Sequence, residues 1–228
     1  MISLKLLDVQ LIINNMKKVN TVILDFNGTI LDDLDLCFNV LNEMLNMYNH
    51  PSITKEEYLD IFTFPVIEYY RKAGFNFDKE PFDELAPIFI NKYQPNSLNC
   101  PLHEGMVEMI NKWRSENKKI VLLSASKRNL MMDQLEHFKI VDLFDEILGT
   151  GTINAVGKVE LAIEYLERNH VDKETTIMIG DTLHDDEIAS VLGVSSFLVA
   201  KGHQSKERLL KSNATVLDDI REIKNYIY

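Results

Sequence analysis

Short runs of β-branched and other apolar residues recur along the chain, and each is followed by a stretch with helical periodicity. Four such runs are clear, at Thr21 to Asp25, Lys119 to Ser124, Thr176 to Asp181 and Ser195 to Ala200, and the neighbours of Val216 suggest a fifth. Strands that alternate with helices are typical of a parallel sheet, because each crossover is usually a helix. The pattern therefore predicts an α/β fold with a Rossmann-like parallel sheet core and helices on both faces.

Helical periodicity is clearest in two places. Apolar residues within 159–166 recur at i, i+3, i+4 and i+7, so Lys158 should lie in the first turn of an amphipathic helix, close to the strand ends. Near the end of the chain, Ile220, Ile223 and Ile227 are spaced to share one face of a terminal helix.

The alternation breaks between residues 35 and 98, where helical patterns rich in aromatic residues are punctuated by prolines. We interpret residues 35–98 as a small all-helical cap inserted into a core made of residues 21–34 and 99–228. Residues 1–20 would be an N-terminal extension. Within the insert, the aromatic residues of 62–70 are expected to form the core of the cap rather than to contact substrate.

The charge of the chain narrows the classes of partner. Its 228 residues include 24 basic and 35 acidic ones, and the net charge of −11 predicts no nucleic-acid partner. No run approaches the length of about 20 apolar residues that spans a bilayer, so no membrane partner is expected either.

Cys37 and Cys100 are too few for a disulfide framework and indicate reduced thiols in the cytoplasm. Met16 opens a polar run, which suggests residues 1–15 as an extension before the true start; the oligomeric state is left open.

Three of the predicted strands end in residues capable of chemistry. Asp25 ends the first, Ser124 the second and Asp181 the third, and Asp185 follows in the same loop as Asp181. In open parallel sheets, ligands bind outside the carboxyl ends of the strands. With Lys158 added, the sequence predicts carboxylates, a hydroxyl and an ammonium around one crevice.

The order of these residues resembles that of a known family. The run Asp25 to Ile30 is similar to the first motif of the haloacid dehalogenase superfamily, usually Asp-x-Asp-Gly-Thr, and Ser124, Lys158 and the run Gly180 to Asp185 are its ordered companions. The resemblance covers about residues 21–200 and is nearest to phosphoglycolate phosphatase-like members with a helical C1-type cap.

This resemblance implies a phosphohydrolase that acts on a small phosphorylated substrate. Asp25 would be the nucleophile, because a carboxylate attacking phosphorus splits one difficult transfer into two easier steps. Its all-oxygen surroundings favour Mg²⁺ as cofactor. The implied metal ligands are Asp25, the backbone carbonyl of Asn27, Asp181 and Asp185.

The remaining positions of the motifs are implied to bind phosphate. Lys158 would hold the nucleophile and the phosphate by charge, and Ser124 would donate a hydrogen bond to a phosphoryl oxygen. The turn at Gly28 and Thr29, together with Ala125, would add to the phosphate site.

Asn27 departs from the pattern, because family phosphatases carry at this position an aspartate that serves as general acid and base. Three hypotheses explain the missing acid and base. The enzyme is restricted to substrates with good leaving groups, His184 or His103 replaces the aspartate as acid and base, or the protein binds phosphoryl groups with little turnover. Because of its position in the motif, Asn27 is expected to be one of the catalytic residues, together with Asp25, Ser124 and Lys158. The run Gly202 to Ser205 is interpreted as a polar turn.

Other classes of protein use similar chemistry. A receiver domain also carries a phosphoaccepting Asp, but it is much shorter and lacks the insert. A phosphomutase normally needs the acid that Asn27 replaces. A phosphonate hydrolase needs a cap lysine that forms a Schiff base, for which Lys55, Lys72 and Lys79 are the candidates.

Overall fold

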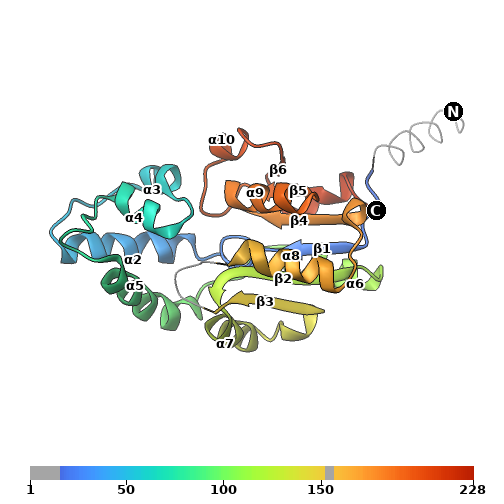
Figure 1. The fold of residues 1–228 in the computed structure, drawn as a ribbon, viewed down its shortest axis with the longest axis horizontal. Coiled ribbons are helices and arrows are strands. Elements are labelled where there is room, and N and C mark those ends of the chain that lie inside the picture. The colour runs from blue at the N-terminus through green and yellow to red at the C-terminus, as the bar shows by residue number, and fades with distance from the viewer. Residues whose placement is uncertain (1–15, 152–156) are drawn as a thin grey trace, which may run out of the picture.

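The protein is built on one six-stranded parallel sheet with the strand order β3-β2-β1-β4-β5-β6 (Figure 1). The computed structural model describes residues 16–151 and 157–228. The strands are β1 (Thr21–Leu24), β2 (Lys119–Lys127), β3 (Glu146–Thr150), β4 (Thr176–Gly180), β5 (Ser195–Val199) and β6 (Thr215–Leu217). Their register sets Leu24, at the end of β1, beside Leu122 of β2 and Ile179 of β4. The carboxyl ends of the three central strands therefore meet at one edge.

Two details of the sheet and one of the C-terminal helix differ from the sequence prediction. β3 was not predicted, because its run is short and holds Gly149, a residue that weakens a strand pattern. β2 continues past Ser124 to Lys127 after a shift of register. The end of the chain forms a 3₁₀ helix, Ile220–Asn225, and not an α-helix.

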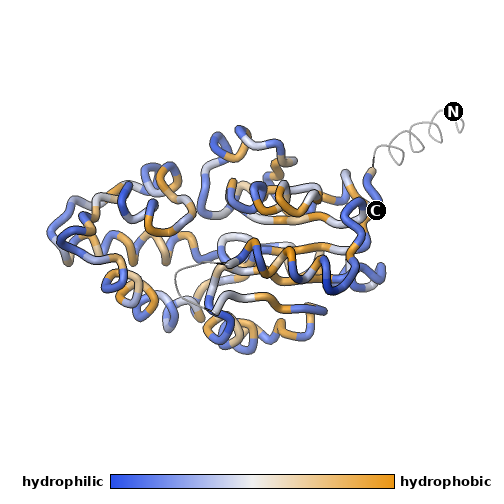
Figure 2. Tube along the Cα trace, in the orientation of Figure 1, coloured by the Kyte–Doolittle hydropathy of each residue, from blue (hydrophilic) through white to orange (hydrophobic). Residues whose placement is uncertain are grey.

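Helices cover both faces of the sheet, which confirms the predicted fold class. Apolar strand residues that point to one face pack with α6 (Met106–Ser115) and α7 (Arg128–Phe138). Those on the other face pack with α8 (Lys158–Arg168) and α9 (Leu183–Leu192). Figure 2 shows the strands largely in hydrophobic colours. The described part of the core also contains three short helices, which are α10 (Lys206–Leu209) and the 3₁₀ turns Val141–Leu143 and Lys173–Thr175.

Between β1 and β2 the chain leaves the sheet to form a separate helical unit, called the cap below (Figure 1). Its helices are α2 (Leu34–Met47), α3 (Lys55–Ile61), α4 (Val66–Ala73) and α5 (Phe82–Ser97). Thr54 and Glu57 form a capping box that fixes the start of α3. The cap has a hydrophobic cluster of its own, which includes Leu41, Tyr58 and Leu85.

The described part of the expected N-terminal extension packs onto the end of the chain. Lys17 forms a parallel bridge with Ile227, and the amide of Val19 donates to the carbonyl of Tyr228. Val19 is buried in the core. The suggested extension of residues 1–15 lies outside the described residues. Across the described ranges, no helix combines the length and apolar character needed to cross a membrane.

Candidate active site

Three buried carboxylates meet at the carboxyl ends of the central strands. Asp25 directly follows β1, Asp181 directly follows β4, and Asp185 lies in the first turn of α9. One oxygen from each lies within 4.8 Å of the others. The parallel register explains the first two positions, and the capping geometry of α9 explains the third. The side-chain hydroxyl of Thr182 donates to Asp185 Oδ2 over 2.7 Å.

Lys158 is the cation among these acids. It is the first residue of α8, as the sequence predicted, and its side chain is buried. Its ammonium donates to Asp25 Oδ1 over 2.6 Å and to Asp185 Oδ1 over 2.8 Å. One ammonium among three carboxylates leaves an excess of negative charge in a buried place.

The pKa values of the three carboxyl groups and of Lys158 reflect the burial and the excess of negative charge. Burial raises the pKa of the Asp25 carboxyl to about 8, against the opposing effect of Lys158. Burial likewise raises the pKa of Asp181 to about 6. The pKa of Asp185 is lowered despite its burial, because Lys158 favours its ionised form, and the pKa of Lys158 is correspondingly raised. Protons therefore relieve part of the repulsion, and a hard dication would replace them.

Asp181 is held in place by the first turn and by a loop after β5. The Thr29 hydroxyl donates to Asp181 Oδ1 over 2.9 Å, and the backbone amide of His203 donates to Oδ2 over 2.7 Å. Gly28 lies so close that a Cβ there would come within 2.4 Å of Asp181 Oδ2, and its φ is +73°. Only glycine fits this turn. The Thr29 hydroxyl thus contacts a proposed metal ligand, and it was expected in the phosphate site.

Hydroxyls line the other side of Asn27. The Ser126 hydroxyl donates to Asn27 Oδ1 over 2.8 Å, and Ser124 Oγ lies 3.5 Å from the same oxygen. Ser124 Oγ also accepts from the backbone amide of Ser126. The carbonyl of Ala125 accepts from the Thr150 hydroxyl. The predicted hydroxyl position is therefore a pair of serines, with Ser124 just before the register shift in β2 and Ser126 within it.

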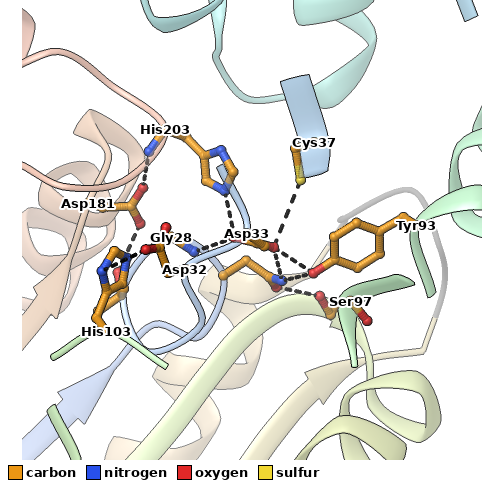
Figure 3. Close-up of polar contacts among 12 residues, drawn as sticks. Gly28, Asp32, Asp33, Cys37, Tyr93, Ser97, His103, Asp181 and His203 are labelled. Carbon is orange, nitrogen blue, oxygen red and sulfur yellow. Dashed lines mark hydrogen bonds and ion pairs between the residues drawn. The ribbon is translucent and has the colours of Figure 1, made fainter. Parts of the chain in front are cut away.

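The amide nitrogen of Asn27 faces a buried carboxylate that the sequence analysis missed. It donates to Asp33 Oδ2 over 2.9 Å and to the Tyr93 hydroxyl over 2.6 Å. Asp33 is 0% exposed and also accepts from the amide of Gly28 and from the Tyr93 hydroxyl. Figure 3 shows Asp33 at the centre of these contacts.

Asp33 provides a physical reason for the amide at position 27. An aspartate there would set a second carboxylate against Asp33, where Asn27 now donates a hydrogen bond. Two like charges at hydrogen-bond distance in a buried place cannot both ionise readily. Asn27 and Asp33 are therefore a matched pair.

His203 is the second residue that the sequence analysis missed, since the run Gly202 to Ser205 was interpreted as a turn. Its ring is buried, and Nε2 lies 3.1 Å from Asp33 Oδ1 (Figure 3). Its Nδ1 lies 2.8 Å from the Tyr58 hydroxyl. The ring also stacks on Phe62 of the cap at 4.6 Å between centroids. Although burial opposes it, Asp33 raises the pKa of His203, as expected of an ion pair.

The two histidines proposed as rescuers lie elsewhere. His184 stacks on Phe64, and its Nδ1 lies 3.3 Å from Glu187. His103 lies 3.9 Å from Asp32. Neither side chain lines the cavity described below.

A cavity that is partly open to solvent joins the acids to the cap. Its core side is polar and charged, with Asp25, Ser124, Lys127 and Lys158 among the lining residues. Its cap side is formed by α3 to α5 and the segment between α3 and α4. The aromatic residues of 62–70, interpreted as cap core, do pack together, but they also face this cavity.

Comparison with known proteins agrees with this arrangement. Residues 22–199 match the haloacid dehalogenase-like hydrolase family. A pyrophosphatase of Halalkalibacterium halodurans is 22% identical over 171 residues, which cover 74% of this chain and 77% of the relative. A phosphoglycolate phosphatase of Aliivibrio fischeri is 18% identical over 210 residues, covering 88% and 92%.

Solved structures show the same fold. That of protein tyrosine kinase A from Mycobacterium tuberculosis superposes with a TM-score of 0.75 at 22% sequence identity, covering 91% of this chain and 97% of that one. The match to the family spans most of the sequence, including β1, the cap and β5. The chain therefore belongs to the haloacid dehalogenase-like hydrolase family.

Proposed function

We propose that the protein is a Mg²⁺-dependent phosphohydrolase that hydrolyses a small phosphorylated molecule through a phosphorylated Asp25. The observation that carries the proposal is the placement of Asp25, buried, bonded to Lys158 and within 4.8 Å of two further carboxylates at one end of a cavity. Carboxylates with a pKa shifted by burial and by a specific charged partner, next to a cavity, are concentrated at functional sites.

The residues present fit a magnesium ion. Asp25, Asp181 and Asp185 offer buried carboxylate oxygens, and the backbone carbonyl of Asn27 completes the proposed ligand set. Oxygen ligands of this kind are those that Mg²⁺ prefers. When bound, the ion would neutralise negative charge on the phosphoryl group and keep the carboxylates ionised.

In the first half-reaction, an Asp25 carboxylate oxygen attacks phosphorus and the bond from phosphorus to the leaving oxygen breaks. The ammonium of Lys158 and the hydroxyl of Ser124 stabilise the charge on the phosphoryl oxygens. In the second half-reaction, water attacks the phosphorus of the phosphorylated Asp25, which releases phosphate and restores the carboxylate. Asn27 lies where a general acid and base would act, and an amide neither gives nor takes the proton.

The alternatives have less support. Lys55, Lys72 and Lys79, the candidates for a phosphonate hydrolase, do not line the cavity. The Lys55 ammonium is instead paired with Asp35. A phosphoryl-binding protein with little turnover would share the whole site, and only activity separates it from an enzyme.

The activities for which the relatives are named fit the proposal. A pyrophosphatase, a phosphoglycolate phosphatase and a tyrosine kinase all handle phosphoryl groups. A cytoplasmic location is also proposed, and it is supported by the two free cysteines, Cys37 and Cys100.

Phosphate release tests the proposal. Wild type, Asp25→Asn and Asp32→Asn would be assayed on acetyl phosphate, para-nitrophenyl phosphate and a panel of metabolite phosphates, with Mg²⁺ and with a chelator. The proposal expects Mg²⁺-dependent turnover that Asp25→Asn abolishes and Asp32→Asn, a neighbouring acid outside the cavity lining, retains. Turnover that survives in Asp25→Asn or in chelator would contradict it.

A further inference from the structure

The cap side of the cavity is a wall of aromatic and aliphatic side chains. Its members come from α4, α5 and the segment just before α4, and all line the same cavity as Asp25. They include Phe62, Phe64, Val66, Phe82, Phe89 and Ile90. Phe89 stacks on Tyr93 with ring centroids 5.6 Å apart, which fixes the wall next to Asp33. An apolar surface of this kind recognises a flat apolar group.

The wall carries no charged group. Among the described residues that line the cavity, every lysine, histidine and carboxylate except Asp33 belongs to the core side, and Asp33 lies at the base of the cap, paired with His203. Cap cations lie elsewhere: Lys92 pairs with Glu43, and Arg71 pairs with Glu68. A leaving group with its own carboxylate or further phosphate would find no cation on this side, and burying an unpaired charge is costly.

The core side adds a separate constraint on the leaving group. Asn27 cannot supply a proton, and it is held by contacts at both ends of its amide, with Ser126 on the oxygen and Asp33 on the nitrogen. The leaving oxygen must therefore depart with the electron pair of the broken bond and without protonation. A phenol, with a pKa of about 10, leaves as an anion far more easily than an alcohol does.

From these two constraints we propose that the substrate is a phosphate monoester of a phenol-type hydroxyl, with its aromatic ring against the cap wall. The inference rests on the proposed function and specifies its substrate. An Asp25 oxygen forms the new bond to phosphorus, and the aryl oxygen leaves as a phenolate that takes its proton from water. Hydrolysis of the phosphorylated Asp25 then completes the cycle.

Four substrates separate the two constraints. Phenyl phosphate has a ring and a good leaving group, benzyl phosphate has a ring and a poor one, acetyl phosphate has a good leaving group without a ring, and phosphoglycolate has neither feature. The proposal expects kcat/KM for phenyl phosphate to exceed that for benzyl phosphate by about 10² or more, because general acid catalysis is missing. It also expects acetyl phosphate to be turned over with a higher KM than phenyl phosphate.

Two variants test the wall. Phe89→Ala should lower kcat/KM for phenyl phosphate about tenfold, mainly through KM, and should lower kcat/KM for acetyl phosphate, which has no ring to contact the wall, by much less. The matched control is Phe77→Ala, another half-buried cap phenylalanine that does not line the cavity. It should leave both substrates unchanged, and thermal melting would show that each variant is folded.

The possible failures are distinguishable. Benzyl phosphate or phosphoglycolate turned over as well as phenyl phosphate would overturn this inference and leave the proposed phosphohydrolase intact. An equal effect of Phe89→Ala on phenyl and acetyl phosphate would also overturn it. Absence of turnover on all four substrates would contradict both the inference and the proposed function.

Discussion

The core side and the cap side of the cavity differ in the chemistry of their side chains and in how those side chains are positioned. On the core side, buried charges and hydroxyls follow the ends of β1, β2 and β4, and their spacing is set by the register of a rigid sheet. On the cap side, neutral aromatic rings from α3 to α5 pack into their own cluster. Charge needs fixed geometry, whereas apolar recognition needs only shape and area. This difference assigns reaction chemistry to the sheet and substrate choice to the cap.

The two sides meet at Asp33. This carboxylate accepts from the amide of Gly28 on the core side and from the hydroxyl of Tyr93 on α5. His203, which holds Asp181 through its backbone, also contacts Asp33 and stacks on Phe62. The position of the cap is therefore linked by hydrogen bonds to a proposed metal ligand.

The largest effect is expected on the core side. Asp25→Asn should lower kcat by about 10⁴ or more on every substrate, because the amide is no nucleophile. No cap substitution should approach this value. Steady-state rates, with thermal melting to confirm folding, measure it. A cap variant that lost as much activity on acetyl phosphate would break the division between the two sides.

A swap of amide and carboxylate tests the matched pair of Asn27 and Asp33. Asn27→Asp alone should destabilise the protein without a gain in rate, because the new carboxylate faces Asp33. The double variant Asn27→Asp with Asp33→Asn should raise kcat for benzyl phosphate by about 10², since a general acid returns without the repulsion. Steady-state rates on benzyl phosphate and thermal melting of the single and double variants measure these effects. Equal activity of the two would show that Asp33 does not constrain position 27.

Magnesium should stabilise the fold in a pH-dependent way. Burial raises the pKa of Asp25 to about 8 and that of Asp181 to about 6, both above the ordinary value of 3.8. Their contribution to stability is present below about pH 4 and is lost as the pH rises through the folded values, so the metal-free protein should weaken toward about pH 8.

Because Mg²⁺ replaces the protons, the rise in Tm that it causes should be larger at about pH 8 than at about pH 5. At about 100 times Kd the rise should be roughly 5–10 °C. Scanning fluorimetry measures it, with Asp181→Asn as the control that reduces the response. An equal rise at both pH values would contradict the proposed ligands.

The smallest effect is expected near Asp33, where the core side and the cap side of the cavity meet. Tyr93→Phe removes a hydroxyl that donates to Asp33 and accepts from Asn27. It should lower the free energy of unfolding by about 1–3 kcal/mol, because buried partners lose a hydrogen bond. Urea denaturation measures this loss, and Tyr48→Phe, a cap tyrosine that does not line the cavity, is the matched control.

The sequence predicted the core side better than the cap side, for a physical reason. Asp25, Asp181 and Lys158 follow strands or begin a helix, so local patterns place them at one edge of the sheet. The contacts of Asp33 with Tyr93, and of His203 with Tyr58 and Phe62, depend on how the cap packs against the core, which no local pattern encodes. The only advance signals were an acidic pair after the first turn and a polar run after a strand.

Phosphorylation of Asp25 is the central claim, and acid quenching during turnover tests it most directly. Since Asn27 cannot activate water, the second half-reaction should be slow and the phosphorylated form should accumulate. With para-nitrophenyl phosphate and Mg²⁺, the account predicts a burst of nitrophenol close to one per enzyme. Treatment of the quenched protein with hydroxylamine should then give a hydroxamate at Asp25, seen by peptide mass analysis. No hydroxamate at Asp25, together with phosphate on another residue such as His203, would contradict the account.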